Sequence, residues 1–121
     1  MTIPDFISAL KVQTSDAAVR GTIKTLERPA GRRPAARLLE MSNWYLTLSD
    51  ADKTMLRAVL QESAEAAVFN FLCVLDGVSV IEDGPNKGTL QLNYINQSEN
   101  ILISDGQFSS LHDEYNALCQ S

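Results

Sequence analysis

The sequence is poor in the residues that metal sites and disulfide frameworks require. It holds one histidine and two cysteines among 121 residues. Cys73 and Cys119 are too few for a disulfide scaffold and lack the C-x-x-C spacing of zinc and redox sites. We interpret them as unpaired thiols, with Cys73 in the core and Cys119 partly exposed. Catalytic signatures such as G-x-S-x-G and H-E-x-x-H are missing too, so we expect no cofactor, no metal ion and no enzymatic activity.

Long apolar stretches are also scarce. The N-terminus lacks a basic segment followed by an apolar one, and no window reaches the roughly 18 apolar residues of a membrane span. The longest apolar run, residues 66–75, is interrupted by Asn70 and is typical of a buried helix. We therefore expect a cytoplasmic protein that does not contact a membrane.

The composition is that of an ordinary globular protein, with 45% hydrophobic and 21% charged residues. A chain of 121 residues has the usual size of one domain and can bury one core. The sequence therefore predicts a single globular domain over residues 1–121.

Helical spacing dominates the first two thirds. Pro4 is placed to open a short helix, and Ser15 is placed as the N-cap of a second helix that ends at Pro29. A third helix is predicted over residues 34–45, with Pro34 in its first turn, and a long fourth one over residues 50–75.

The fourth helix should be the centre of the fold. Ser49 and Asp52 resemble a capping box at its start, and Gly77 supplies a left-handed residue after its end. Apolar residues lie on nearly all sides from Ala66 onward, so we expect the second half to run through the middle of the domain.

Alternation with a period of two follows. Three short strands are predicted at residues 78–80, 90–94 and 101–103, and residues 83–88 are rich in turn formers. Helical spacing returns from Phe108 to Cys119. We therefore predict an α+β fold: about five helices with a long central one, a three-stranded antiparallel β-meander, and a C-terminal helix packed against it.

Charge is divided unevenly. Residues 1–37 carry seven basic and three acidic side chains, whereas residues 38–121 carry three basic and twelve acidic ones, which gives balances of +4 and −9. Such a field can steer a charged partner. The acidic candidates for partner binding are Asp76, Glu82, Asp83, Asp105, Asp113 and Glu114. They are also compatible with solvated charge, but residues 76–87 do not match a calcium loop.

A basic segment is the alternative binding surface. Arginine forks match carboxylate and phosphate geometry, so the segment could bind nucleic acid or an acidic protein. It could equally be a solvated face, because the chain as a whole is acidic and no aromatic residues are interleaved to stack on bases. Its members are Arg20, Lys24, Arg28, Arg32, Arg33 and Arg37.

His112 is the remaining candidate for chemistry. Beside Asp113 on the last helix it could serve a small enzyme, but one histidine without a partner motif is more typical of a structural side chain that bonds a strand or loop.

Three segments, 71–77, 81–88 and 111–116, resemble a family of small uncharacterised bacterial proteins over most of the chain. This resemblance implies no activity and no functional residues. Size and acidity are similar to those of immunity proteins that neutralise bacterial toxins. We therefore expect a small acidic protein-binding module, of immunity or regulatory type, that occludes a basic surface on a toxin, a nuclease or another protein.

Overall fold

The computed structural model describes residues 1–107 and 109–121. Phe108, expected at the start of the last helical segment, lies outside the described residues. The elements are α1 (Ile3–Lys11), the π-helical turn η1 (Val12–Asp16), α2 (Ala17–Glu27), α3 (Ala36–Leu46), α4 (Asp50–Leu75), β1 (Leu92–Ile95), β2 (Asn100–Ser104) and α5 (Leu111–Gln120). The α+β class is confirmed.

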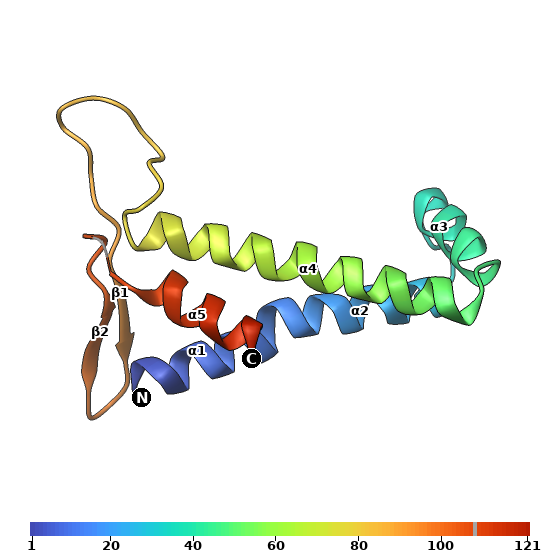
Figure 1. The fold of residues 1–121 in the computed structure, drawn as a ribbon, viewed down its shortest axis with the longest axis horizontal. Helices are drawn as coiled ribbons and strands as arrows, with labels where there is room; N and C mark the ends of the chain where they lie inside the picture. The colour runs from blue at the N-terminus through green and yellow to red at the C-terminus, as the bar shows by residue number, and fades with distance from the viewer. Residues whose placement is uncertain (108) are drawn as a thin grey trace.

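The molecule is an elongated rod (Figure 1). Elements α1, η1 and α2 follow one another without a break and form one continuous helical rod, α1–α2. The described residues therefore form four separate helical segments rather than the five that were predicted. The rod α1–α2 runs antiparallel to α4, which is the longest helix at 26 residues. At one end α3 packs on α2, and at the other end α5 packs on both α1 and α4, next to the strands.

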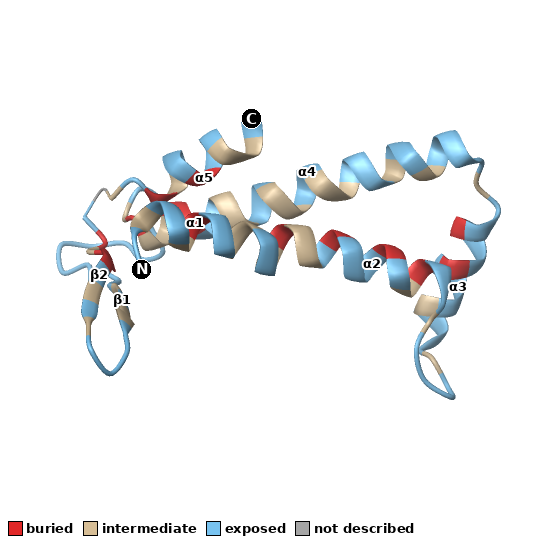
Figure 2. Cartoon of the chain, turned by 90° about the horizontal axis from the view of Figure 1, so that it is seen from below, coloured by how far each residue is buried: buried red, intermediate tan, exposed pale blue. Residues whose placement is uncertain are grey.

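The core is split into two clusters along the rod (Figure 2). The cluster at the strand end consists of Ile7, Leu72, Ile103, Leu111 and Tyr115. The cluster at the α3 end consists of Val19, Ile23, Leu26 and Tyr45. Each cluster therefore joins segments that are distant in sequence, and the helical hairpin connects the two.

The turn η1 corrects the prediction that Ser15 caps a new helix. Ser15 is buried, and its hydroxyl donates to the Lys11 carbonyl at 3.2 Å within the continuous rod. In an uninterrupted α-helix, Val19 and the core side chains that follow it in α2 would be offset from Ile7 of α1 by about one residue. The two sets of core side chains would then face different sides of the helix. A π-helical turn holds one residue more than an α-helical turn, so η1 brings the core side chains of α1 and α2 to the same side.

Most helix ends follow the local chemistry. The Ser49 hydroxyl accepts from the amide of Asp52, which confirms this half of the capping box. Gly77 has φ +80°, as expected for the residue that ends α4. The start of α3 is wrong in the prediction, because α3 begins at Ala36 and Pro34 lies before it.

The three-stranded meander is also wrong, because the sheet has two strands. β1 and β2 pair antiparallel, from Leu92 opposite Ser104 to Ile95 opposite Asn100, with an irregularity between Leu92 and Asn93. Residues 78–80 form no strand, since the amides of Val78 and Ser79 both donate to the Cys73 carbonyl, at 2.9 and 3.1 Å. These donors complete the C-terminal cap of α4 and are not available to a sheet.

The second half of α4 does not run through the middle of the fold. Leu72 and Cys73 are buried, but Phe71 is 60% exposed, because neighbours cover only one side of the helix.

By length and composition α4 could cross a membrane: its last 18 residues have a mean hydropathy of 1.4 with two charges, Glu62 and Glu65. The core helix of a soluble protein can have the same length and composition.

Candidate functional site

The acidic residues do not form one surface. Asp76 is completely buried, so this carboxylate cannot contact a partner. Glu82 and Asp83 are exposed in the loop that follows α4, and Asp113 and Glu114 are exposed in the first turn of α5. Asp105 is half-buried and accepts hydrogen bonds from the Gln107 amide and the Ser109 hydroxyl, which hold the pKa of its carboxyl below the ordinary value. Five of the six residues thus remain available at the strand end.

Asp76 joins three elements. Its Oδ2 lies 2.8 Å from the backbone amide of His112 and 2.6 Å from His112 Nδ1, and its Oδ1 accepts from the Ser104 hydroxyl at 3.1 Å. The carboxylate therefore ties the end of α4 to the end of β2 and caps the N-terminus of α5.

His112 is held in place from every side. Nδ1 faces Asp76, Nε2 lies 3.5 Å from Asp113 Oδ1, and the ring packs edge-on against Phe69 with centroids 5.9 Å apart. The nearby Cys73 thiol is buried, and this burial raises its pKa, so the thiol stays protonated and is a poor nucleophile. Asp76, Asp113 and Phe69 thus fix the position of the His112 ring.

A second polar cluster lies midway along the rod. Lys11 Nζ is 2.8 Å from Asp16 Oδ1 and 3.5 Å from Glu65 Oε2, and Gln61 Nε2 donates to both carboxylates. The hydrogen bond to Lys11 lowers the pKa of Asp16, and the same bond raises the pKa of Lys11. This cluster fixes the helical hairpin where α4 crosses η1.

The fold separates charge along its long axis. Residues 17–60 form the α3 end and carry eight basic and four acidic side chains, a balance of +4. The remaining residues form the strand end and carry two basic and eleven acidic side chains, a balance of −9. The spatial division differs from the sequence division at residue 37, because residues 1–16 lie at the acidic end and residues 38–60 lie at the basic end.

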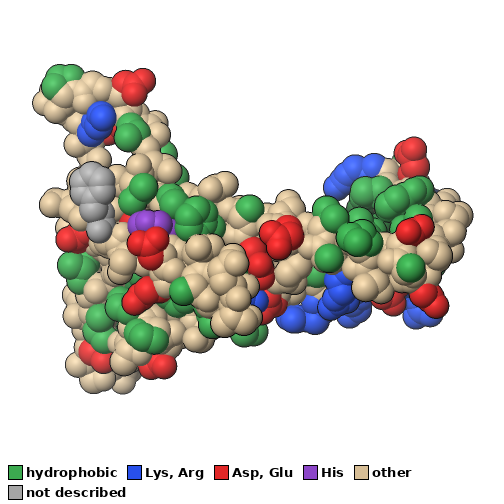
Figure 3. All heavy atoms as spheres, viewed as in Figure 1, with side chains coloured by type: hydrophobic (Ala, Val, Ile, Leu, Met, Phe, Trp, Pro, Cys, Tyr) green, Lys and Arg blue, Asp and Glu red, His purple; other side chains and the backbone are tan. Residues whose placement is uncertain are grey.

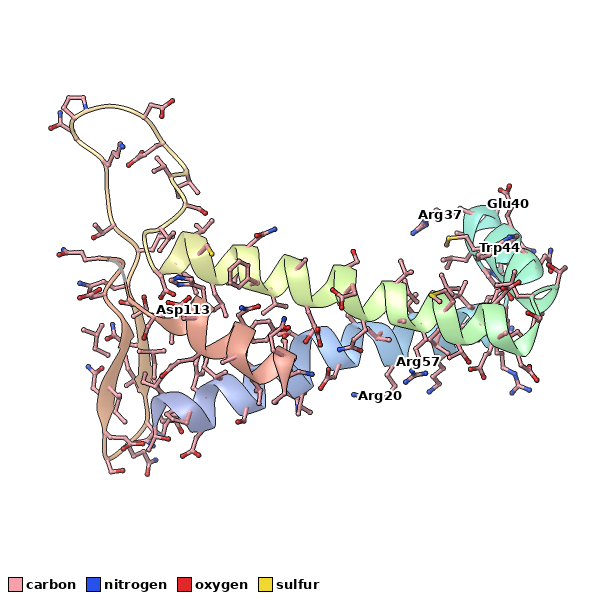
Figure 4. The ribbon with its side chains drawn as sticks, viewed as in Figure 1. Arg20, Arg37, Glu40, Trp44, Arg57 and Asp113 are labelled. Carbon is pink, nitrogen blue, oxygen red and sulfur yellow. The ribbon has the colours of Figure 1, made fainter. Side chains whose placement is uncertain are left out.

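The basic candidates are all exposed but do not share one face. In the view of Figure 4, Arg20 and Arg57 of α4 both lie on the lower side of the hairpin, whereas Arg37 lies on the upper side, near Trp44. Lys24, Arg28, Arg32 and Arg33 are exposed on α2 and in the connection that follows it. Sequence reasoning missed Arg57, because only the packing of α2 on α4 places it on the same side of the hairpin as Arg20.

An apolar groove at the α3 end is the largest unpredicted feature. It has a volume of about 630 Å³ and opens between α2, α3 and α4. Leu38, Met41 and Trp44 form one wall, and Leu56 and Leu60 form another. Figure 3 shows hydrophobic side chains gathered at this end of the molecule. Leu38, Met41 and Trp44 have the helical spacing of core residues, and only the sideways placement of α3 leaves them open.

Comparisons with known proteins add no further constraint. No protein family, no curated protein and no solved structure matches this chain.

Among residues 1–107 and 109–121, no three histidine, cysteine, aspartate or glutamate side chains lie close enough to hold a metal ion. The candidate sites are therefore the acidic strand end and the apolar groove.

Proposed function

We propose that this chain is a non-enzymatic protein-binding module, of immunity or regulatory type, whose acidic end covers a basic surface of a partner protein. The observation that carries the proposal is the unequal charge of the two halves of the rod, −9 in the half that holds the strands and +4 in the half that holds α3. Such a field speeds the encounter with a basic partner and weakens as salt screens it.

The acidic end also offers exposed side chains that a partner can reach, although Glu82 accepts from the Gly88 amide and Asp113 lies 3.5 Å from His112 Nε2. Glu82, Asp83, Asp113 and Glu114 are exposed, and none of the four is needed by either hydrophobic cluster. Asp113 and Glu114 stand at the N-terminus of α5, whose dipole favours negative charge there. The acidic groups are therefore positioned without a cost to the fold.

Capture from native lysate with charge-reversed variants tests the proposal. The first variant changes Glu82, Asp83, Asp113 and Glu114 to lysine, and the matched control changes the exposed Glu27, Glu40, Asp50 and Asp52 of the α3 end to lysine. We expect the wild type and the control to retain the same basic protein after nuclease treatment. The first variant should lose it, and the association rate should fall as salt rises.

Two results would count against this function. One is retention of the same partner by the first variant with unchanged affinity. The other is a bound fraction that disappears on nuclease treatment, which would indicate nucleic-acid binding through the basic residues.

A further inference from the structure

The chain exposes more surface than a compact protein of its mass. Its accessible surface is 8473 Å², whereas a compact monomer of 13.3 kDa exposes roughly 6,500 Å². The excess of about 2,000 Å² is more than the roughly 800 Å² that each partner contributes to a standard protein interface. The elongated hairpin therefore has enough uncovered area for a stable interface.

Much of this area is apolar and lies on α4 and α3. Met55 is 65% exposed and Val59 55% exposed on α4, and Trp44 is 53% exposed on α3. Only 11% of the apolar 18-residue window of α4 is buried. Exposed apolar side chains that gather at one end of a molecule mark a candidate interaction surface.

The groove makes this surface concave along the seam between α2 and α4. A second hollow, lined in part by Ser63, Ala64 and Ala67, shares Ala18, Thr22 and Leu60 with the groove and extends it along the seam between α2 and α4. Small side chains along a seam let another helix approach closely, and the Met and Trp side chains at the α3 end can adapt to it. The surface thus fits a helix laid along the hairpin.

We infer that the occupant is a second copy of this chain, in an antiparallel dimer with twofold symmetry. A twofold rotation perpendicular to the rod sets the +4 end of each copy beside the −9 end of the other. The charge pattern is therefore complementary to itself, and a twofold interface is the commonest one in soluble oligomers. Each acidic end carries more negative charge than the basic end that it faces carries positive charge, so both ends of the dimer keep a net negative charge.

Light scattering coupled to size exclusion tests this inference on the purified full chain, with no partner present. We expect a mass twice that of the 13.3 kDa chain at low salt. Met41→Glu and Trp44→Glu should each raise the dimer dissociation constant by about 100-fold, because each places a charge in the apolar groove. Both side chains are exposed in the single chain, so circular dichroism should show unchanged helix content.

Ile95→Glu is the matched control, since Ile95 is 67% exposed on β1, away from the groove. This variant should remain dimeric, and the wild-type dimer should weaken as salt rises. A monomer at every concentration would overturn the inference, as would a dimer that Ile95→Glu dissociates and Trp44→Glu does not. A dimer insensitive to salt would overturn the antiparallel arrangement. These measurements involve no partner, so their failure is distinct from failure of the proposed function.

Discussion

The Tyr115 hydroxyl donates a hydrogen bond of 2.7 Å to the hydroxyl of Ser15, and both side chains are buried. The bond joins α5 to the π-helical turn across 100 positions of the sequence. Burial raises the pKa of Tyr115 to about 12. The two residues therefore link the C-terminal helix to the N-terminal rod at the edge of the strand-end cluster.

Tyr115→Phe should remove this link and change the response to alkali. Because the pKa of Tyr115 is near 10 in the unfolded chain and about 12 in the folded one, the wild type should lose about 2 to 3 kcal/mol of stability as pH rises from 10 to 12. The variant should lack this part of the decline, and at neutral pH it should be about 1 kcal/mol less stable. Urea unfolding at several pH values measures both, with Tyr94→Phe in the half-buried hairpin as control.

Asp76→Asn should strongly destabilise the fold, although it replaces only one carboxylate oxygen by an amide nitrogen. The amide keeps one oxygen to accept from His112, and its NH2 can donate to the Ser104 hydroxyl, but the negative charge that faces His112 and the N-terminus of α5 is lost. We expect a loss of about 3 kcal/mol in the free energy of unfolding. Asp113→Asn, on the exposed neighbour of His112, should stay within about 0.5 kcal/mol of the wild type, and equal effects of the two changes would refute the structural role of Asp76.

Gly106→Ala tests the packing between the two loops of the strand end. Gly106 has φ +73°, and an added Cβ would collide with the backbone of Leu90. Gly84 has φ +112° with no atom within 4 Å of such a Cβ, so Gly84→Ala carries backbone strain without the collision. We expect a cost of about 1 kcal/mol at Gly84 and at least about 3 kcal/mol at Gly106, measured by thermal unfolding.

Lys11→Met should return the pKa of Asp16 toward its ordinary value. In the wild type the Lys11 hydrogen bond lowers this pKa, so its stabilising contribution is present above the ordinary value and is lost as pH falls through the lowered one. The carboxyl of Asp16 should titrate at higher pH in the variant, as carbon NMR can follow. Lys87→Met in the exposed loop is the control and should leave the Asp16 titration unchanged.

The sequence was informative where local chemistry decides the structure. Ser49 and Gly77 mark the ends of α4 because a cap and a left-handed residue act within one turn. It failed where distant contacts decide. Val78 was assigned to a strand from its alternation, but its amide is taken by Cys73. Asp76 was assigned to the surface as a charge, but Ser104 and His112 satisfy it inside the fold.

The same limit applies to the candidate surfaces. The unequal distribution of charge was visible in the sequence, but its spatial division was not, because the hairpin places residues 1–16 beside the acidic C-terminal residues and residues 38–60 beside the basic ones. The groove was not visible, since Trp44 and Leu60 have the spacing of core residues and only the position of α3 decides whether they are covered.

The π-helical turn η1 also determines where the chain length can change. Deletion of one exposed residue within it, such as Gln13, would leave an uninterrupted α-helix in which Ile7 and Val19 come into phase without the wide turn. The same deletion at Arg20 would rotate the rest of α2 by about 100° and turn Ile23 toward water. The first helical rod can therefore shorten at η1 and keep both of its packing faces, at the expense of the anchoring of Ser15.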